Sequence, residues 1–312
     1  MAKIVLTTTP SFSNTIVRSP DLAEFLDEHS WRVVLDERLN PPFSFNPEEV
    51  AAMVAGALLP VGKKEFSLFP NLKVVMPFGV GLEHIDIPAL EERGIALKFF
   101  PGINKHSVAE LTMAFIFTLA RNIVPFANDM REGKWKRTSA TQVSGKTLGI
   151  VGLGNIGKEV AKMARNLGMR VLANDIVYDE DFLKSIGVEK SELETLLQKS
   201  DFITFHVPLT DLTKQIVNEK LLSLLKPGAY VINTSRGEVT DEKALLAAVE
   251  SGWVAGVALD VFSEEPPFNN EILKRLISHP KVIAMPHIAT FTPETQYAVA
   301  KKICEELVNH GK

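Results

Sequence analysis

The feature that most constrains the fold is an alternation, repeated twice along the chain, of short apolar runs and longer helix-compatible segments. This alternation is typical of parallel sheets that helices cover on both faces. The first series of apolar runs lies at 4–6, 33–35, 57–59, 74–76 and 96–97. The second lies at 147–151, 171–173, 202–205, 230–233, 257–259 and 282–285. The sequence therefore predicts an α/β protein with two doubly wound parallel-sheet domains.

A helix is expected to begin near Ser107, between the two series. Ser107 and Glu110 fit a capping box, in which each side chain binds an unpaired amide of the first turn. The following residues, 111–120, are apolar nearly all round, so the helix should be buried on several sides. We expect it at a domain junction, at a subunit interface, or at both. The apolar segment is too short to cross a bilayer.

Charge and cysteine content narrow the possible partners and location. The 312 residues include 34 Lys and Arg and 38 Asp and Glu, a net charge of -4, so no broad positive field attracts nucleic acid or anionic membrane. A small anionic substrate remains compatible with this balance. The single cysteine, Cys304, excludes an internal disulfide and a cysteine-based metal cluster, and no metal site is predicted. The N-terminus lacks the apolar stretch of a signal peptide, so we expect a cytoplasmic protein.

A glycine-rich motif follows the first strand of the second series. Gly152, Gly154 and Gly157 form a G-x-G-x-x-G motif that opens a predicted helix. Glycines at these positions allow a tight turn, close approach of the backbone to a diphosphate, and close packing of helix on strand. Asp175 follows the next strand at the ~20-residue spacing expected of a ribose-binding carboxylate, and it would repel a 2′-phosphate. The motif predicts NAD binding in preference to NADP, although a purely structural glycine turn is the alternative.

Three polar side chains each follow a strand of the second series. Arg236, Glu265 and His287 should therefore lie at one edge of the sheet, where open α/β sheets bind ligands. An imidazole can transfer a proton, a carboxylate beside it raises its pKa, and a guanidinium can bind a substrate carboxylate. Taken singly, each residue is more simply explained as a structural or surface group. Together they predict a catalytic site.

These motifs resemble those of the D-2-hydroxyacid dehydrogenase family over nearly the whole chain. The resemblance rests on 79–81, 85–86, 107–110, 152–157, 233–237, 260–267 and 286–287. Within the family, 133–135, 145–149 and 264–267 are most similar to the phosphoglycerate dehydrogenase branch. The resemblance implies hydride transfer between NAD and a small 2-hydroxy or 2-oxo acid, such as 3-phosphoglycerate, glyoxylate or hydroxypyruvate.

The resemblance also implies roles for individual residues. Arg236, Glu265 and His287 match the catalytic residues, and Gly79, Val80 and Gly81, with Arg236 and His287, match the substrate-binding positions. Asp260 matches a residue that contacts the nicotinamide carboxamide, whereas Asp86 is expected only to cap the next helix. Besides the three glycines and Asp260, the expected cofactor-binding residues are Asn155, Ile156, Asp175, His206, Val207, Pro208, Thr213, Thr234 and Ser235.

The family architecture implies the domain arrangement. Residues 101–287 would form a Rossmann NAD-binding domain, inserted into a flavodoxin-like substrate domain of residues 1–100 and 288–312. Substrate would bind in the cleft between the domains. The resemblance further implies a homodimer built through the nucleotide domain and the helix near Ser107.

Alternatives to this interpretation remain at the level of substrate and activity. The loop at 76–79 lacks the arginine that phosphoglycerate-type enzymes often carry near Pro77, while Arg137 is either a phosphate ligand across a dimer or a solvated loop residue. A non-catalytic, NAD(H)-sensing interaction protein similar to the corepressors of this fold is the second hypothesis. An enzyme of the same fold with an inorganic or sulfonated substrate is the third.

Overall fold

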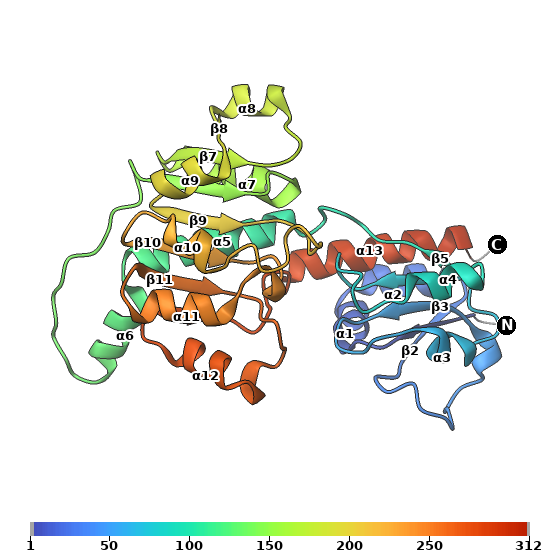
Figure 1. Cartoon of the computed structure of the whole chain (residues 1–312). Helices are drawn as coiled ribbons and strands as arrows, with labels where there is room; N and C mark the ends of the chain where they lie inside the picture. Colours follow the sequence, from blue (N-terminus) through green and yellow to red (C-terminus); the bar gives the residue numbers. More distant parts are fainter. Residues whose placement is uncertain (1–2, 311–312) are drawn as a thin grey trace. The chain divides into compact units, whose positions relative to one another are not determined.

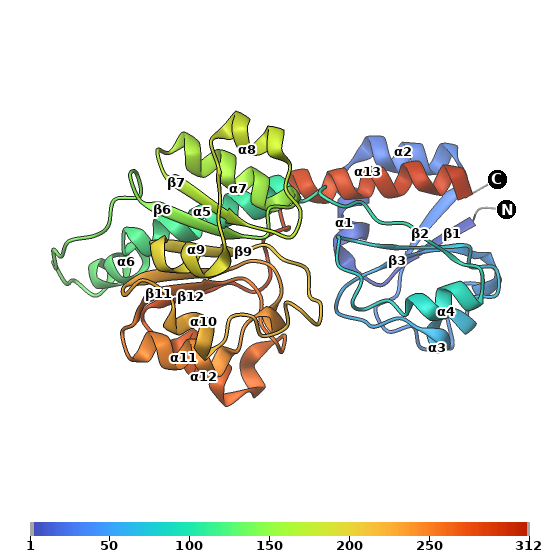
Figure 2. The same ribbon diagram turned by 45° about the horizontal axis from the view of Figure 1, so that its top comes forward.

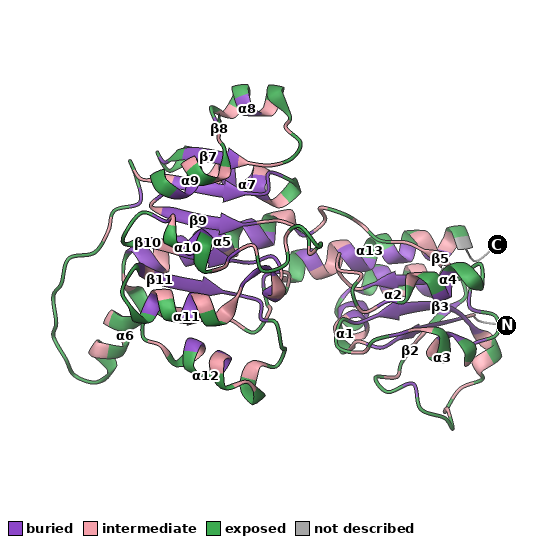
Figure 3. Cartoon of the chain, in the orientation of Figure 1, coloured by how far each residue is buried: buried purple, intermediate pink, exposed green. Residues whose placement is uncertain are grey.

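The computed structural model describes residues 3–310 and divides into two compact units (Figure 1). The first unit contains Met1–Asn104 and Thr290–Lys312, and the second contains Lys105–Ala289. We expected domain boundaries at 100/101 and 287/288, so the unit boundaries lie a few residues further along the chain. In each unit the sheet is the buried layer, and exposed residues lie mainly on helices and loops (Figure 3).

The first unit is a five-stranded parallel sheet in the order β2-β1-β3-β4-β5. This is the strand order of flavodoxin-like folds. The strands are β1 (Lys3–Thr7), β2 (Trp31–Leu35), β3 (Val50–Ala55), β4 (Val74–Pro77) and β5 (Ala96–Leu97). The helices are α1 (Pro10–Arg18), α2 (Pro20–Glu28), α3 (Lys63–Ser67), α4 (Ile87–Glu92) and α13 (Pro293–His310), with a 3₁₀ turn η1 at Pro47–Glu49.

Alternate side chains of this sheet enter two cores, as expected for a strand period of two. Val5 and Val54 pack with α1, α2 and α13, whereas Ile4 and Met53 pack with α3 and α4 (Figure 2). The helix α13, for which periodicity alone could not identify a packing partner, packs its apolar face against α1 and α2. The end of the described chain thus completes the core of the first unit.

The prediction of a strand at 57–59 is wrong. The strand lies earlier, at β3, and residues 57–59 form a turn in which Leu58 is 91% exposed. The β3 sequence VAAMVA is rich in alanine, which has low strand propensity, so local propensity gives little signal there. Burial of all six residues between two helical layers decides the conformation instead.

The second unit is a seven-stranded parallel sheet in the order β12-β11-β10-β9-β6-β7-β8. Counted from β6, this is the 3-2-1-4-5-6 order of dinucleotide-binding folds with one further strand, and its switch point lies between β6 and β9. The strands are β6 (Thr147–Val151), β7 (Arg170–Asn174), β8 (Glu189–Lys190), β9 (Phe202–Phe205), β10 (Ala229–Asn233), β11 (Val254–Leu259) and β12 (Val282–Ala284). The helices are α5 (Lys105–Ala120), α6 (Ile123–Arg131), α7 (Asn155–Asn166), α8 (Glu180–Ile186), α9 (Leu193–Lys199), α10 (Glu219–Ser223), α11 (Glu242–Glu250) and α12 (Glu271–Ser278), with 3₁₀ turns η2 (Gly237–Val239) and η3 (Pro267–Asn269).

The long apolar helix begins earlier than predicted. Because α5 starts at Lys105, Ser107 lies inside its first turn, and the predicted capping box is wrong. The burial expected for this helix is confirmed, since α5 packs on α7, β10 and β11 within the second unit. No single helix within residues 3–310 is long and apolar enough to span a membrane. The α5–α6 pair, which is bent by 62°, has the length and composition of a membrane-spanning segment, but nothing else indicates that it is one.

Candidate active site

The glycine motif forms the turn between β6 and α7. Gly152 has a φ of +96°, and a Cβ there would lie 2.5 Å from the carbonyl oxygen of His206. A Cβ on Gly157 would lie 2.1 Å from the carbonyl oxygen of Gly152. At Gly154, in contrast, a Cβ would meet no heavy atom within 4 Å. Gly152 and Gly157 therefore serve packing within the turn, whereas nothing in the packing requires glycine at Gly154.

The N-terminus of α7 suits an anion. Gly154 is its N-cap residue and supplies no side-chain cap to the amides of the first turn. Uncapped helix N-termini offer N–H donors and a positive dipole end to a phosphate. These features fit the diphosphate of a dinucleotide.

The roles of Gly154 and Gly157 can be distinguished experimentally. Gly154→Ala is expected to leave the melting temperature close to that of wild type but to weaken NADH binding by about tenfold or more, because a methyl group would occupy the diphosphate approach. Gly157→Ala should instead lower the melting temperature, because its Cβ meets backbone. Thermal unfolding and NADH fluorescence titration measure the two effects. A Gly154→Ala protein that binds NADH as wild type does would contradict the role of the turn.

Asp175 is bound to the glycine turn. It follows β7, and its carboxylate accepts the backbone N–H groups of Leu153 and Val177. Its own N–H donates to the Tyr178 hydroxyl at 3.0 Å. The carboxylate is therefore fixed beside the turn, where it fits the ribose role predicted from its spacing.

The loop after β9 is held by internal hydrogen bonds. His206 Nε2 lies 3.0 Å from the Thr204 hydroxyl, while its Nδ1 is buried and has no hydrogen-bond partner among the described residues. Burial lowers the pKa of His206 to about 3, so the imidazole is neutral near pH 7. The Thr213 hydroxyl donates to the Pro208 carbonyl. Cofactor contacts of His206, Val207, Pro208 and Thr213 stay predictions.

Thr234 and Ser235 use their hydroxyls inside the protein. Thr234 Oγ1 lies 3.1 Å from the Thr112 hydroxyl of α5. The Ser235 hydroxyl donates to Asn233 Oδ1 at 2.7 Å. Both residues are buried, so they hold the end of β10 in place. Their predicted contacts with the cofactor, and those of Asn155 and Ile156 in the first turn of α7, stay predictions.

Glu265 and His287 are in direct contact. His287 Nδ1 lies 2.8 Å from Glu265 Oε2, and Glu265 Oε1 accepts the backbone N–H of Phe262 at 3.0 Å. An ionised carboxylate only accepts hydrogen bonds, so Nδ1 donates and Nε2 is left for another partner. His287 keeps 42% and Glu265 31% of its side-chain surface exposed, so reactants can reach them.

The charges around this pair set its ionisation. The hydrogen bond to Glu265 raises the pKa of His287; burial and the charge of Arg236 oppose this increase. Burial acts to raise the pKa of Glu265, but the hydrogen bonds from His287 and Phe262 and the nearby positive charges outweigh it, and the pKa is lowered. Arg236, which follows β10, is thus close enough to act on both groups. The three residues together can hold a proton and an anion.

Asp260 has a contact that the sequence did not reveal. It is fully buried, and its two carboxylate oxygens accept the N–H groups of Ile288 and Ala289 at 2.8 and 2.9 Å. Burial raises the pKa of Asp260, and these hydrogen bonds oppose the increase. Asp260 therefore holds the backbone that follows His287, whose φ is +54°. A contact with the nicotinamide carboxamide stays a prediction.

Gly237 is a second residue whose importance the sequence did not reveal. A Cβ there would lie 1.9 Å from the carbonyl carbon of Phe262 and 2.3 Å from the Ser263 nitrogen. The backbone after Arg236 and the backbone before Glu265 therefore touch. The available signal was that a glycine directly follows a candidate catalytic arginine.

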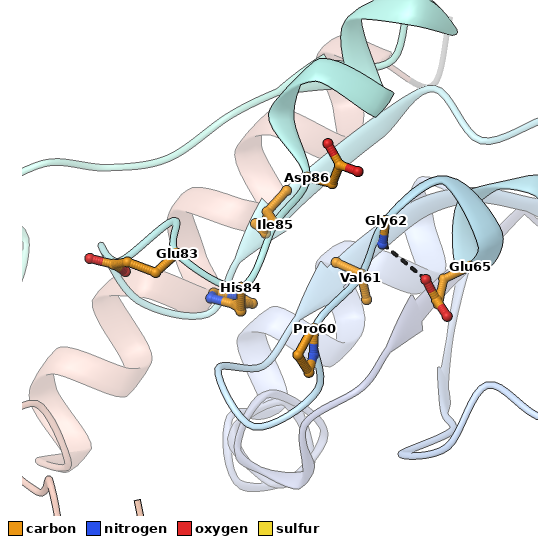
Figure 4. A pocket seen from close by; sticks show the side chains of 8 residues that line it. All are labelled: Pro60, Val61, Gly62, Glu65, Glu83, His84, Ile85 and Asp86. Carbon is orange, nitrogen blue, oxygen red and sulfur yellow. Dashed lines mark hydrogen bonds between the residues drawn. The ribbon is translucent and has the colours of Figure 1, made fainter. Parts of the chain in front are cut away.

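The remaining candidates lie in the first unit. Gly79, Val80 and Gly81 follow the carboxyl end of β4, and their predicted binding of a substrate carboxylate stays a prediction. Asp86 caps α4 by accepting the Ala89 N–H at 3.1 Å, which confirms its structural role. Near it, a hollow of about 460 Å³ is lined by 60–62, Glu65 and 83–86 (Figure 4). Within residues 3–310, no group of three His, Cys, Asp or Glu side chains could hold a metal ion.

Known proteins match both the sequence and the fold. A family model described as the NAD-binding domain of D-isomer-specific 2-hydroxyacid dehydrogenases matches residues 113–289. Glyoxylate reductase of Korarchaeum cryptofilum is 39% identical over 82% of this chain and 78% of its own length. D-3-phosphoglycerate dehydrogenase of Bacillus subtilis is 41% identical over 84% of this chain but 49% of its own length. The structure of Aquifex aeolicus D-lactate dehydrogenase, complexed with NAD and lactic acid, is similar with a TM-score of 0.82 and 28% identity, over 98% of this chain and 94% of that chain.

Proposed function

This chain belongs to the D-isomer-specific 2-hydroxyacid dehydrogenase family, and on that premise we propose that it interconverts a small 2-oxo acid and its D-2-hydroxy acid with Arg236, Glu265 and His287 as catalytic residues. It is an NAD-dependent oxidoreductase that acts on CH–OH groups. The observation that carries the proposed site is the 2.8 Å contact between Glu265 and His287 within reach of the Arg236 charge.

The chemistry divides between the cofactor and the protein. NAD, when bound, accepts or supplies the hydride. His287 Nε2 supplies the proton to the oxo oxygen during reduction and removes it during oxidation. Arg236 binds the substrate carboxylate and stabilises negative charge at the oxo oxygen. Glu265 keeps the ring oriented and favours its protonated form. The α7 N-terminus and Asp175 fit the diphosphate and ribose of the dinucleotide.

The substrate is proposed to be a short, anionic 2-oxo acid. The substrates named for the relatives, glyoxylate and D-3-phosphoglycerate, share the 2-oxo or 2-hydroxy carboxylate and differ in the group attached to it. NADH oxidation with glyoxylate, hydroxypyruvate, pyruvate and 3-phosphohydroxypyruvate tests the proposal, with turnover of at least one expected. If none were reduced, sulfonated and inorganic substrates would be tried next. An NADH-gated protein partner without any turnover would favour the non-catalytic hypothesis.

Assembly as a homodimer is part of the proposal. Side chains of α6 and the loop after it leave apolar surface exposed, including Ile123, Val124, Met130 and Trp135. Exposed apolar groups gathered on one segment are suited to a protein interface. Light scattering after gel filtration should give about twice the chain mass.

Arg137, which is exposed in the same loop, is proposed to bind a substrate phosphate. Arg137→Ala should therefore impair turnover of phosphorylated substrates only.

We also propose which ligand each of the two units binds. The second unit would bind NAD, and the first, through Gly79, Val80 and Gly81, would bind the substrate carboxylate. A cytoplasmic location stays our prediction from the sequence. Cell fractionation would test it.

Asp175 is expected to decide between the two nicotinamide cofactors. Asp175→Ala removes the negative charge that repels a 2′-phosphate and should raise the NADPH/NADH ratio of kcat/KM by about tenfold or more. The variant also loses acceptors for Leu153 and Val177, so its melting temperature should be measured alongside. Asp175→Asn, which keeps one acceptor without the charge, is the matched comparison. An unchanged ratio in both variants would contradict the assignment.

Glu265 is expected to control the pH dependence. Because its hydrogen bond raises the pKa of His287, Glu265→Gln should lower that pKa. In the oxidation direction His287 must be neutral, so activity that wild type loses as the pH falls should persist to lower pH. In the reduction direction His287 must be protonated. The activity that is lost as the pH rises should therefore be lost at a lower pH than in wild type. Profiles of kcat against pH in both directions measure the shift, and parallel shifts upward would contradict it.

A further inference from the structure

The loop that carries Glu265 is bound by a glutamate of a neighbouring helix. Glu242 is the first residue of α11, and its Oε1 accepts the backbone N–H of Ser263 at 2.8 Å. Its Oε2 accepts the hydroxyl of the same serine. Both carboxylate oxygens of Glu242 are thus engaged by one residue, two positions before Glu265.

The surroundings of Glu242 do not otherwise favour a carboxylate. Burial raises its pKa, and the negative charges of Glu238 and Asp241 raise it further. The two hydrogen bonds from Ser263 oppose these effects. A partly buried carboxylate among like charges is stabilised there by its hydrogen bonds, so the Ser263 contact defines where this side chain lies.

Ser263 is connected in turn to the catalytic pair. The residue before it, Phe262, donates its backbone N–H to Glu265, whose other oxygen contacts His287. The same backbone lies against Gly237, directly after Arg236. A displacement of Ser263 therefore moves the donor that orients Glu265.

We propose that Glu242 and Ser263 are positioning residues, which hold the loop at 262–265 so that Glu265 keeps its hydrogen bond to Nδ1 of His287. The inference rests on the proposed function, because the pair they position is its acid–base site. Neither residue needs to touch substrate or cofactor for this role.

The proposed role predicts a change in the pKa of His287. The charged groups that act on His287 are Glu265 and Asp260, which raise its pKa, and Arg236, which lowers it. Loosening the loop weakens the hydrogen bond between Glu265 and His287, whereas Asp260 is held separately by Ile288 and Ala289. The pKa of His287 should then fall. A contribution of Glu242 to folding alone would lower thermal stability without this shift.

The test compares Glu242→Ala with Glu242→Gln. The alanine variant loses both contacts and should lower the His287 titration midpoint by about one pH unit and kcat by about tenfold, with KM for NADH unchanged. The glutamine variant can accept the Ser263 N–H through Oε1 and donate to its hydroxyl through Nε2, so it should behave much as wild type does. Histidine-selective NMR of the whole protein, assigned with His287→Asn, gives the midpoint without turnover.

Controls make the outcomes decisive. Glu250→Ala removes an exposed glutamate at the other end of α11, paired with Arg275, and should leave the midpoint and kcat unchanged. Ser263→Ala removes only the hydroxyl and should shift the midpoint in the same direction by less; it tests the idea even if Glu242→Ala does not fold. Glu242→Gln as impaired as Glu242→Ala would overturn the inference. So would alanine variants with the wild-type midpoint. A wild-type protein inactive on every acid would contradict the proposed function instead, and the midpoint would still test the pairing.

Discussion

Replacing His287 by asparagine is expected to lower the rate of 2-oxo acid reduction by about 10²–10⁴-fold, the usual contribution of a positioned acid–base group. Asparagine cannot exchange a proton near pH 7, so the oxo oxygen would have to take its proton from water. It is the suitable substitution because His287 has a φ of +54°, a left-handed conformation that asparagine tolerates better than most residues. The backbone amides of Ile288 and Ala289 can then stay on Asp260.

The measurement is kcat with the best substrate of the panel, alongside NADH titration by fluorescence. NADH affinity should remain close to that of wild type, because the glycine turn and Asp175 are unchanged. His279→Asn is the matched control, since asparagine can accept the bond that His279 Nδ1 accepts from the Lys281 amide. If His287→Asn kept more than about a tenth of wild-type turnover, another group would be the acid.

Gly237→Ala is expected to have the second largest effect. Its Cβ would lie 1.9 Å from one backbone atom and 2.1 Å from another in Phe262, so the loop at 262–265 must move. Because the clash is with backbone atoms, no change of side-chain rotamer can relieve it. Moving this loop displaces Glu265 from His287, and a displacement of about 1 Å can lower turnover by about 100-fold. We expect that loss together with a lower pKa of His287.

A comparison with Gly228→Ala separates displacement from lost stability. Gly228 has a φ of +81°, which strains alanine, but a Cβ there would meet no heavy atom within 4 Å. This control should lower the melting temperature while kcat stays near that of wild type. A Gly237→Ala protein with wild-type kcat and a wild-type His287 midpoint would show that the loop adapts without cost to the site.

Most of the fold could be predicted because most strands are runs of branched apolar residues. The runs at β6, β9 and β10 stand out from the polar helices around them. The exceptions have physical reasons. Half of the residues in β3 are alanine, and β8 consists of the exposed pair Glu189 and Lys190, so neither carries a strong strand signal. Pairing with neighbouring strands sets the conformation of both.

The site was predictable to the extent that topology determines it. Residues that follow parallel strands reach the same sheet edge, so Arg236, Glu265 and His287 could be grouped from sequence alone. The groups that hold them could not. Asp260 and Glu242 accept backbone N–H groups, and every residue except proline has one, so no residue pattern marks the partner. Gly237 matters because any side chain there would collide with the backbone of Phe262, and this contact is visible only in the structure.

The packing of α13 against α1 and α2 has a consequence for the order of events during translation. The first unit is made of segments that lie before and after the second unit in the chain, so its core stays incomplete until α13 has emerged from the ribosome. The second unit is one continuous stretch and can mature while synthesis proceeds. The nascent chain therefore exposes the apolar faces of α1 and α2 until α13 is made, and these are segments where a chaperone should be found by crosslinking to stalled intermediates.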